Sequence, residues 1–312
     1  MSHHVHDHDD DHASVYDGLV GGDPSHWAFG TDFEDPLAGV DTTVPEGVDA
    51  ATLGTYCLML ADDALVYSNR LSQWCSNAPD LEEDIALANV ALDLLGQARL
   101  LLARAAAADP SLVPALPEGS PVPPEDALAF FRDDHAFRNV RLVEPEDADF
   151  AEAVVRLLVV STWRLALLAR LSPRRAQVLA AVAAKGVKEV TYHRDHAGRW
   201  VVTLAQGTDE SRRRLLAALR VVWPLRAELD RCHPVEERAA AEGVGVDPRT
   251  VADEVQVLLE HVLSVGGVDR PDVPSVGPLG DGAGREGRHT EALSRMLAEM
   301  QVVARAHPLG RW

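Results

Sequence analysis

The stretch LEEDIALANVALDLLGQARLLLARAAA occupies residues 81–107 and indicates one long α-helix. It is rich in Ala and Leu, which are among the strongest helix formers. Asp80 precedes it as a candidate N-cap, and Glu83 stands three residues later in the capping-box position. A helix of this length must bury its apolar side against other helices, so the segment predicts a helical bundle.

Similar patterns continue along the chain in both directions. In residues 148–171, Val154, Leu157, Leu158, Leu165 and Leu168 recur at helical spacing. Further helices are predicted over residues 52–75, 125–133, 209–229 and 291–306. Two more are predicted to begin at Ser172-Pro173 and at Asp247-Pro248, and to end near residues 205 and 264. No apolar pattern of period two lasts beyond four residues. The fold class is therefore all-α, with four long helices packed as a bundle.

The charge of the chain is unevenly distributed. The 312 residues carry 49 acids and 29 Lys or Arg, a net of −20, yet residues 1–50 hold 12 of the acids and neither basic residue type. The other 262 residues keep 37 acids against 29 bases, a net of −8. This mildly acidic helical part disfavours nucleic acid as a partner. We therefore divide the chain into an acidic, His/Asp-rich extension (1–50), expected to be disordered, and a helical domain (51–312).

The extension and the cysteines suggest a cytoplasmic protein. Residues 1–12 lack the basic region and the apolar region of a signal peptide. The sequence has no run of about 18 apolar residues, so no membrane span is predicted. Three cysteines without a C-x-x-C motif indicate reduced thiols. Five clustered histidines of the extension fit a loose Zn or Ni site, or a solvated tail without a dedicated metal; they are His3, His4, His6, His8 and His12.

A bundle of this size raises the question of a di-iron site. Such a site takes a carboxylate from each of two helices and a Glu-x-x-His from each of the other two. The plausible ligands here number four: Asp62, Asp93, Glu189 and His193. Gly96 stands where the histidine after Asp93 would be, and Lys185 would place an ammonium beside Glu189. We interpret the set as a dead metal site; a solvated or interface face and a working site remain alternatives.

Other candidates for chemistry are weaker. Ser72, Ser161 and Cys75 lack a nearby His–acid pair in the sequence, so none is assigned as a nucleophile. His193 and His196 are three residues apart and could chelate a metal, although a packing or capping role fits the helix as well. We therefore assign no catalytic, cofactor-binding or metal-binding residue.

Several separate stretches resemble one known family. They are LEEDIALANVALDLLGQAR (81–99), AFFRDDHAFRNVRLV (129–143), KEVTYH (188–193), GVGVDPRT (243–250) and HTEALSRMLAEMQ (289–301). In this order they resemble the PaaC family, the structural subunits of bacterial ring-1,2-phenylacetyl-CoA epoxidases. The resemblance runs from about residue 51 to Trp312. Ser161 departs from it, since at least one relative carries an acid there.

The resemblance implies a ferritin-like helical bundle with additional C-terminal helices. It implies a non-catalytic, iron-free structural subunit in a hetero-oligomer with a homologous di-iron catalytic subunit, a small bridging subunit and a reductase. That reductase carries iron–sulfur and FAD groups and uses NADPH. The complex epoxidises phenylacetyl-CoA with O₂ in aerobic phenylacetate catabolism, so the chain would be part of an oxidoreductase that degrades aromatic compounds. Self-association of the chain is left open. The alternative from another class is an independent di-iron oxidase that uses Asp62, Asp93, Glu189 and His193.

Overall fold

The computed structural model of the chain describes residues 40–171, 173–279 and 282–310. By proximity of Cα atoms the chain divides into Met1–Ala38 and Gly39–Trp312, and only the second unit is described below. The histidine cluster predicted as a loose metal site lies outside the described residues. The carbonyls of Thr42 and Thr43 accept hydrogen bonds from Arg104, at 2.5 and 3.2 Å, so this part of the predicted extension contacts the helical bundle.

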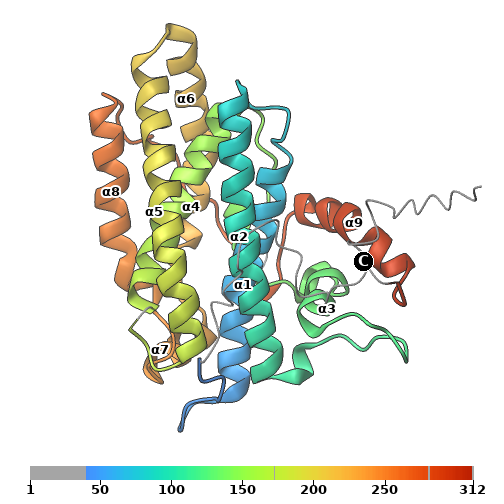
Figure 1. Cartoon of the computed structure of the whole chain (residues 1–312). Helices are drawn as coiled ribbons and strands as arrows, with labels where there is room; N and C mark the ends of the chain where they lie inside the picture. Colours follow the sequence, from blue (N-terminus) through green and yellow to red (C-terminus); the bar gives the residue numbers. More distant parts are fainter. Residues whose placement is uncertain (1–39, 172, 280–281, 311–312) are drawn as a thin grey trace, which may run out of the picture. The chain divides into compact units, whose positions relative to one another are not determined.

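Four long helices form the bundle (Figure 1). They are α1 (Ala50–Ser72), α2 (Leu81–Ala108), α4 (Phe150–Leu171) and α5 (Gln177–Gln206). Helix α1 packs along α2, α4 packs along α5, and α2 touches α5. Asp80 accepts a hydrogen bond from the backbone N–H of Glu83, so the predicted N-cap of α2 is present. The all-α, ferritin-like bundle is confirmed.

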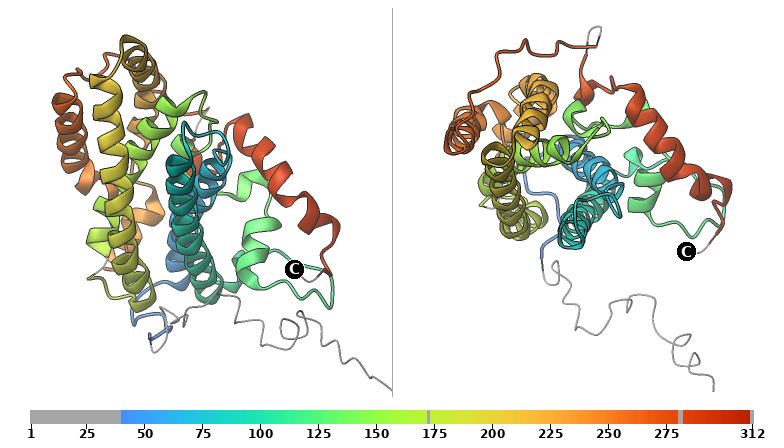
Figure 2. Two further views of the ribbon diagram at one scale, coloured as in Figure 1. Left: turned by 45° about the horizontal axis from the view of Figure 1, so that its top comes forward. Right: turned by 90° about the horizontal axis from the view of Figure 1, so that it is seen from above.

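The additional C-terminal helices surround part of this bundle (Figure 2). They are α6 (Asp209–Val222), α7 (Pro234–Ala241), α8 (Ala252–Val265) and α9 (Glu291–Ala306). Helices α6 and α8 pack on α4, α7 packs on α1, and α9 packs on α3 (Pro124–Phe130). As a result, α1 and α4 are buried on most sides, whereas α2 and α5 keep an outer side.

Some helix boundaries differ from those predicted. Helix α5 begins at Gln177 and not at Ser172-Pro173, because residues 173–175 form a turn: Arg174 N–H donates to the Leu171 carbonyl and Arg175 N–H to that of Gly243. Ser172 itself lies outside the described residues. The helix predicted over 209–229 ends at Val222, and a 3-10 segment follows, since Pro224 has no N–H to donate.

Two features of the helices were missed in the sequence. Helix α7 begins at Pro234 after His233, whose Nδ1 accepts the N–H of Val235 while the carboxylate of Glu236 binds the His233 N–H. Helix α2 is the one described helix long and apolar enough, by length and composition, to cross a membrane. In its most apolar 18-residue window, 44% is buried inside the structure, and the exposed apolar side chains of α2 include Leu92 and Leu95.

Candidate functional site

The centre of the four-helix bundle is polar. Arg164 of α4 is 2% exposed; its Nε donates a 2.9 Å hydrogen bond to Oε1 of Gln97 on α2. Its Nη1 donates to the carbonyl of Leu60 on α1 at 3.2 Å. Gln97 in turn donates through Nε2 to Oε2 of Glu189 on α5, at 2.8 Å. The Arg164–Gln97–Glu189 chain therefore connects all four helices.

Arg164 supplies a permanent positive charge at this centre. Burial lowers its pKa to about 10, and the charges of Asp63 and Glu189 oppose that shift. At neutral pH the guanidinium therefore stays protonated. Its Nη2 has no hydrogen-bond partner among the described residues, so the cation is only partly satisfied by neighbouring groups.

Glu189 is balanced by groups on its own helix and on α2. The Nζ of Lys185 lies 3.4 Å from its Oε1, one helical turn away. The lysine side chain is 49% exposed and the glutamate side chain 15%, so the ammonium lies toward solvent and the carboxylate toward the core. Glu189 therefore accepts a hydrogen bond from the amide of Gln97 and forms a partly exposed ion pair with Lys185.

The two histidines of α5 bind separate acids of α2. Nε2 of His193 lies 3.0 Å from Oδ2 of Asp93, and Nε2 of His196 lies 2.9 Å from Oε2 of Glu83. The ring of Tyr192 stacks on His196, with 5.6 Å between the centroids. Because each imidazole faces its own carboxylate, the two histidines hold α2 against α5 and do not converge on one ion.

The two acids of α1 are bound by arginines from distant parts of the chain. Arg132 donates to both oxygens of Asp62, at 2.9 and 2.5 Å, and the backbone N–H of Arg138 adds a third bond at 2.9 Å. Arg285 donates to both oxygens of Asp63, at 3.0 and 2.8 Å. Both carboxylates are buried, so these are enclosed, bidentate ion pairs.

The four ligands of the alternative oxidase are therefore not gathered at one point. Asp62 binds Arg132, Asp93 binds His193, and Glu189 binds Gln97. Among the described residues, no three His, Cys, Asp or Glu side chains are placed to hold a metal ion. A guanidinium at the centre would repel two further cations. The residues at the centre of this bundle do not fit a di-iron centre.

Four residues that define this centre were missed in the sequence: Gln97, Arg132, Arg164 and Arg285. Arg164 carried a usable signal, since it is the single charge among residues 157–169 of α4, and a fully buried arginine requires partners. Arg132 and Arg285 carried none. Arg132 follows α3, and Arg285 lies within a short 3-10 segment (Gly284–Glu286). Both are far from α1 in sequence, and only the folded chain brings them to Asp62 and Asp63.

The hydroxyl and thiol candidates are engaged in structural contacts or exposed. Ser72 donates to the Ser68 carbonyl at 2.9 Å, and Ser161 donates to that of Leu157 at 2.5 Å. Such bonds to the preceding helical turn are an ordinary structural use of serine. Cys75 is exposed rather than packed. Burial raises the pKa of Cys57 to about 12, so this thiol stays protonated at neutral pH.

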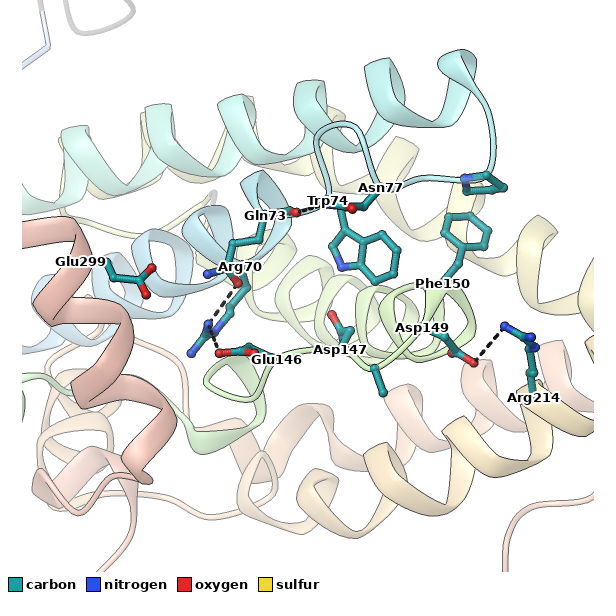
Figure 3. A pocket seen from close by; sticks show the side chains of 12 residues that line it. Arg70, Gln73, Trp74, Asn77, Glu146, Asp147, Asp149, Phe150, Arg214 and Glu299 are labelled. Carbon is teal, nitrogen blue, oxygen red and sulfur yellow. Dashed lines mark hydrogen bonds and ion pairs between the residues drawn. The ribbon is translucent and has the colours of Figure 1, made fainter.

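A surface cavity of about 770 Å³ opens beside the start of α4 (Figure 3). Trp74 and Phe150 contribute aromatic walls, with 6.2 Å between the ring centroids. Beneath them Asp147 is buried and lies 2.7 Å from Nε of Arg156, and burial raises the pKa of this carboxyl. Arg70 and Glu146 approach to 3.5 Å across the opening. These ion pairs fix the loop before α4; the lining residues offer no nucleophile beside a base.

Comparison with known proteins places this architecture in a family. A family model described as "Phenylacetic acid catabolic protein" matches residues 40–312. The chain is also 39% identical, over 262 residues, to a protein of Escherichia coli (strain K12) that is named as one of the subunits of 1,2-phenylacetyl-CoA epoxidase. That alignment covers 83% of this chain and 99% of the relative. The chain therefore belongs to the phenylacetic acid catabolic protein family.

Proposed function

We propose that this chain is the non-catalytic structural subunit of a multicomponent phenylacetyl-CoA 1,2-epoxidase. The relative that it matches over nearly the whole of that relative's length is named as one subunit of such an epoxidase. The observation that carries the non-catalytic part of the proposal is Arg164, whose guanidinium lies between the four helices where a di-iron carboxylate protein gathers its metal ligands.

In this proposal the catalytic chemistry belongs to other chains. A homologous di-iron subunit would bind the metal, and a reductase with iron–sulfur and FAD groups would deliver electrons from NADPH. A small bridging subunit would complete a cytoplasmic complex that uses O₂ to epoxidise phenylacetyl-CoA. This chain would contribute no cofactor. Its contribution is a stiff helical surface that stabilises and shapes the catalytic subunit, because the ion pairs of Asp62 and Asp63 fix its own helices.

Iron content tests the proposal directly. The isolated chain is loaded anaerobically with ferrous iron, desalted and subjected to elemental analysis, with the homologous catalytic subunit as the positive control. We expect far less than one iron per chain, because Arg164 and Gln97 occupy the centre of the bundle. Two tightly held irons per chain would contradict the structural-subunit proposal.

Reconstitution tests the second half of the proposal. The catalytic subunit, bridging subunit and reductase are assayed for NADPH-dependent turnover of phenylacetyl-CoA with and without this chain. We expect turnover and a stable catalytic subunit only when this chain is present. Equal turnover and equal thermal stability without it would show that the chain is not a component of the enzyme.

A further inference from the structure

A groove of about 690 Å³ lies between α5 and α8, which run side by side (Figure 1). Four of its lining residues share one side of α5, at steps of three, one and three; they are Asp195, Gly198, Arg199 and Val202. Four more share one side of α8 at the same steps; they are Leu258, His261, Val262 and Val265. Each helix therefore contributes one wall of what we call the α5–α8 groove.

Gly198 keeps the floor of this groove open. A Cβ atom at Gly198 would lie 3.8 Å from Cγ2 of Val262 and 3.9 Å from Cδ1 of Leu158, which are ordinary van der Waals distances. Alanine would therefore fit, although glycine is the less favourable residue inside a helix. Gly186 of the same helix differs, because a Cβ atom there would lie 2.9 Å from Cδ1 of Leu168. Close packing explains Gly186, whereas the effect of Gly198 is to leave room in the groove.

The walls of the groove are apolar and fixed in place. Valine and leucine side chains from both helices line it, and Val265 is 50% exposed. At one end, Nε2 of Gln206 on α5 donates a 2.9 Å hydrogen bond to the Val265 carbonyl on α8. Beneath, the hydroxyl of the buried Thr162 donates to the Leu158 carbonyl at 2.7 Å. The base of the groove is therefore satisfied internally and suits an apolar group.

One guanidinium at the groove has no acid to bind. Arg194 pairs with its neighbour Asp195 at 2.7 Å. Arg199 is exposed and forms neither an ion pair nor a side-chain hydrogen bond within the described ranges. The groove is therefore cationic, although residues 51–312 together carry more acids than bases. A guanidinium binds a carboxylate through two parallel N–H···O hydrogen bonds, so this site favours an anion with an apolar body.

We propose that the α5–α8 groove binds a small amphipathic carboxylate, whose –COO⁻ group accepts hydrogen bonds from Arg199 and whose alkyl chain lies over Gly198 between the two helices. Small-molecule sites of about 300–1,000 Å³ are mostly apolar and use a few polar groups to orient the ligand. Seven residues of helix extend about 10 Å, which suits an unbranched chain of about eight carbons. Such a site needs only residues of this chain, so it is independent of the proposed function.

Titration calorimetry of the full chain with octanoate tests the site. We expect saturable binding of one octanoate per chain, with a dissociation constant below about 1 mM. Octanamide lacks the charge and acetate lacks the alkyl chain, so each should bind at least about tenfold more weakly than octanoate. The absence of saturable octanoate binding, or equal binding of octanoate and octanamide, would overturn the proposal.

A charge variant locates the carboxylate in the groove. Arg199→Gln should raise the dissociation constant of octanoate about tenfold, because it removes charge-assisted hydrogen bonds. Arg220→Gln on α6 is the matched control: Arg220 is also exposed, forms no ion pair with a described residue and does not line the groove. The control should change the dissociation constant less than about twofold. Equal effects of the two substitutions would contradict the assignment of Arg199.

A volume variant locates the alkyl chain. Gly198→Leu should fill the floor and raise the dissociation constant of octanoate about tenfold, and Gly198→Ala should raise it about twofold. Neither should lower the melting temperature, because both new residues are better helix formers than glycine. Gly96→Leu on α2 is the matched control, since a Cβ atom there has no neighbour within 4 Å and Gly96 does not line the groove. Unchanged octanoate binding in both Gly198 variants would place the chain elsewhere and overturn the proposal.

Discussion

The Nε of Arg164 lies 2.9 Å from Oε1 of Gln97, at the place where four helices of this bundle meet. A di-iron protein joins its helices at that place through metal–carboxylate bonds. Here a side chain provides the positive charge, and the amide of Gln97 passes the connection on to Glu189. The protein thereby joins the same helices through side-chain hydrogen bonds, and the pairing can be tested by substitution.

Replacing Arg164 by Met should destabilise the chain by only about 1–2 kcal/mol, because Met fills the space and leaves the Gln97 Oε1 as the unpaired atom. Arg164→Ala adds an internal cavity, so we expect a loss of about 3–5 kcal/mol. Urea denaturation of the two variants measures the difference. Equal losses would show that the charge, and not the volume, of Arg164 supports the bundle.

Asp62→Ala should be among the most damaging substitutions on α1. It leaves the guanidinium of Arg132 buried without its carboxylate, which costs about 3–5 kcal/mol. Glu189→Ala is the matched comparison: Lys185 is half exposed and regains water, so the cost is about 1–2 kcal/mol. Thermal and urea unfolding measure the loss of stability in each of the two variants. A larger loss for Glu189→Ala would contradict the difference in burial.

Helix α7 should make stability depend on pH through His233. Burial lowers the pKa of His233 below its ordinary 6.5, and its neutral Nδ1 accepts the N–H of Val235. This contribution is complete above pH 6.5, where the unfolded chain is also neutral, and is lost as the pH falls through the lower folded pKa.

His233→Asn is the variant that isolates this effect. Asn keeps a capping oxygen but does not titrate. Between pH 7.5 and 5.5 the parent should therefore lose more unfolding free energy than the variant, by up to about 1 kcal/mol. Parallel pH curves of unfolding free energy for the two proteins would contradict the prediction.

Two truncations should differ sharply in effect. Residues 1–39 have no periodic apolar face, so their removal should leave the melting temperature unchanged. Removal of residues 1–48 also deletes the carbonyls of Thr42 and Thr43 that accept from the buried Arg104, at a cost of about 1–3 kcal/mol. Calorimetry measures the melting temperatures of both truncated chains and of the full chain. An equal, large loss in both would show that residues 1–39 stabilise the bundle.

Most of the helices could be predicted from the sequence alone, although α7 was missed. The spacing of apolar residues, the capping residues and the helix-breaking residues are local properties of the sequence. For this reason α2 begins after Asp80 and α9 covers residues 291–306, as predicted. Prediction from the sequence failed where a distant contact decides a boundary, as at Arg175, whose N–H is tied to the Gly243 carbonyl, so that α5 begins only at Gln177. The ligand count depends on residue types alone, and its reading of Asp62, Asp93 and Glu189 as members of a dead metal site stays a prediction.

The partners of those acids follow from long-range packing and not from any local pattern. Asp62 lies 70 residues from Arg132 in sequence and Asp63 lies 222 from Arg285, and no local pattern encodes such pairings. The same holds for Arg164, Gln97 and Glu189, which meet because three helices converge. Burial makes these pairings obligatory, since a charge removed from water must find a partner. Which partner it finds depends on the packing of the whole chain.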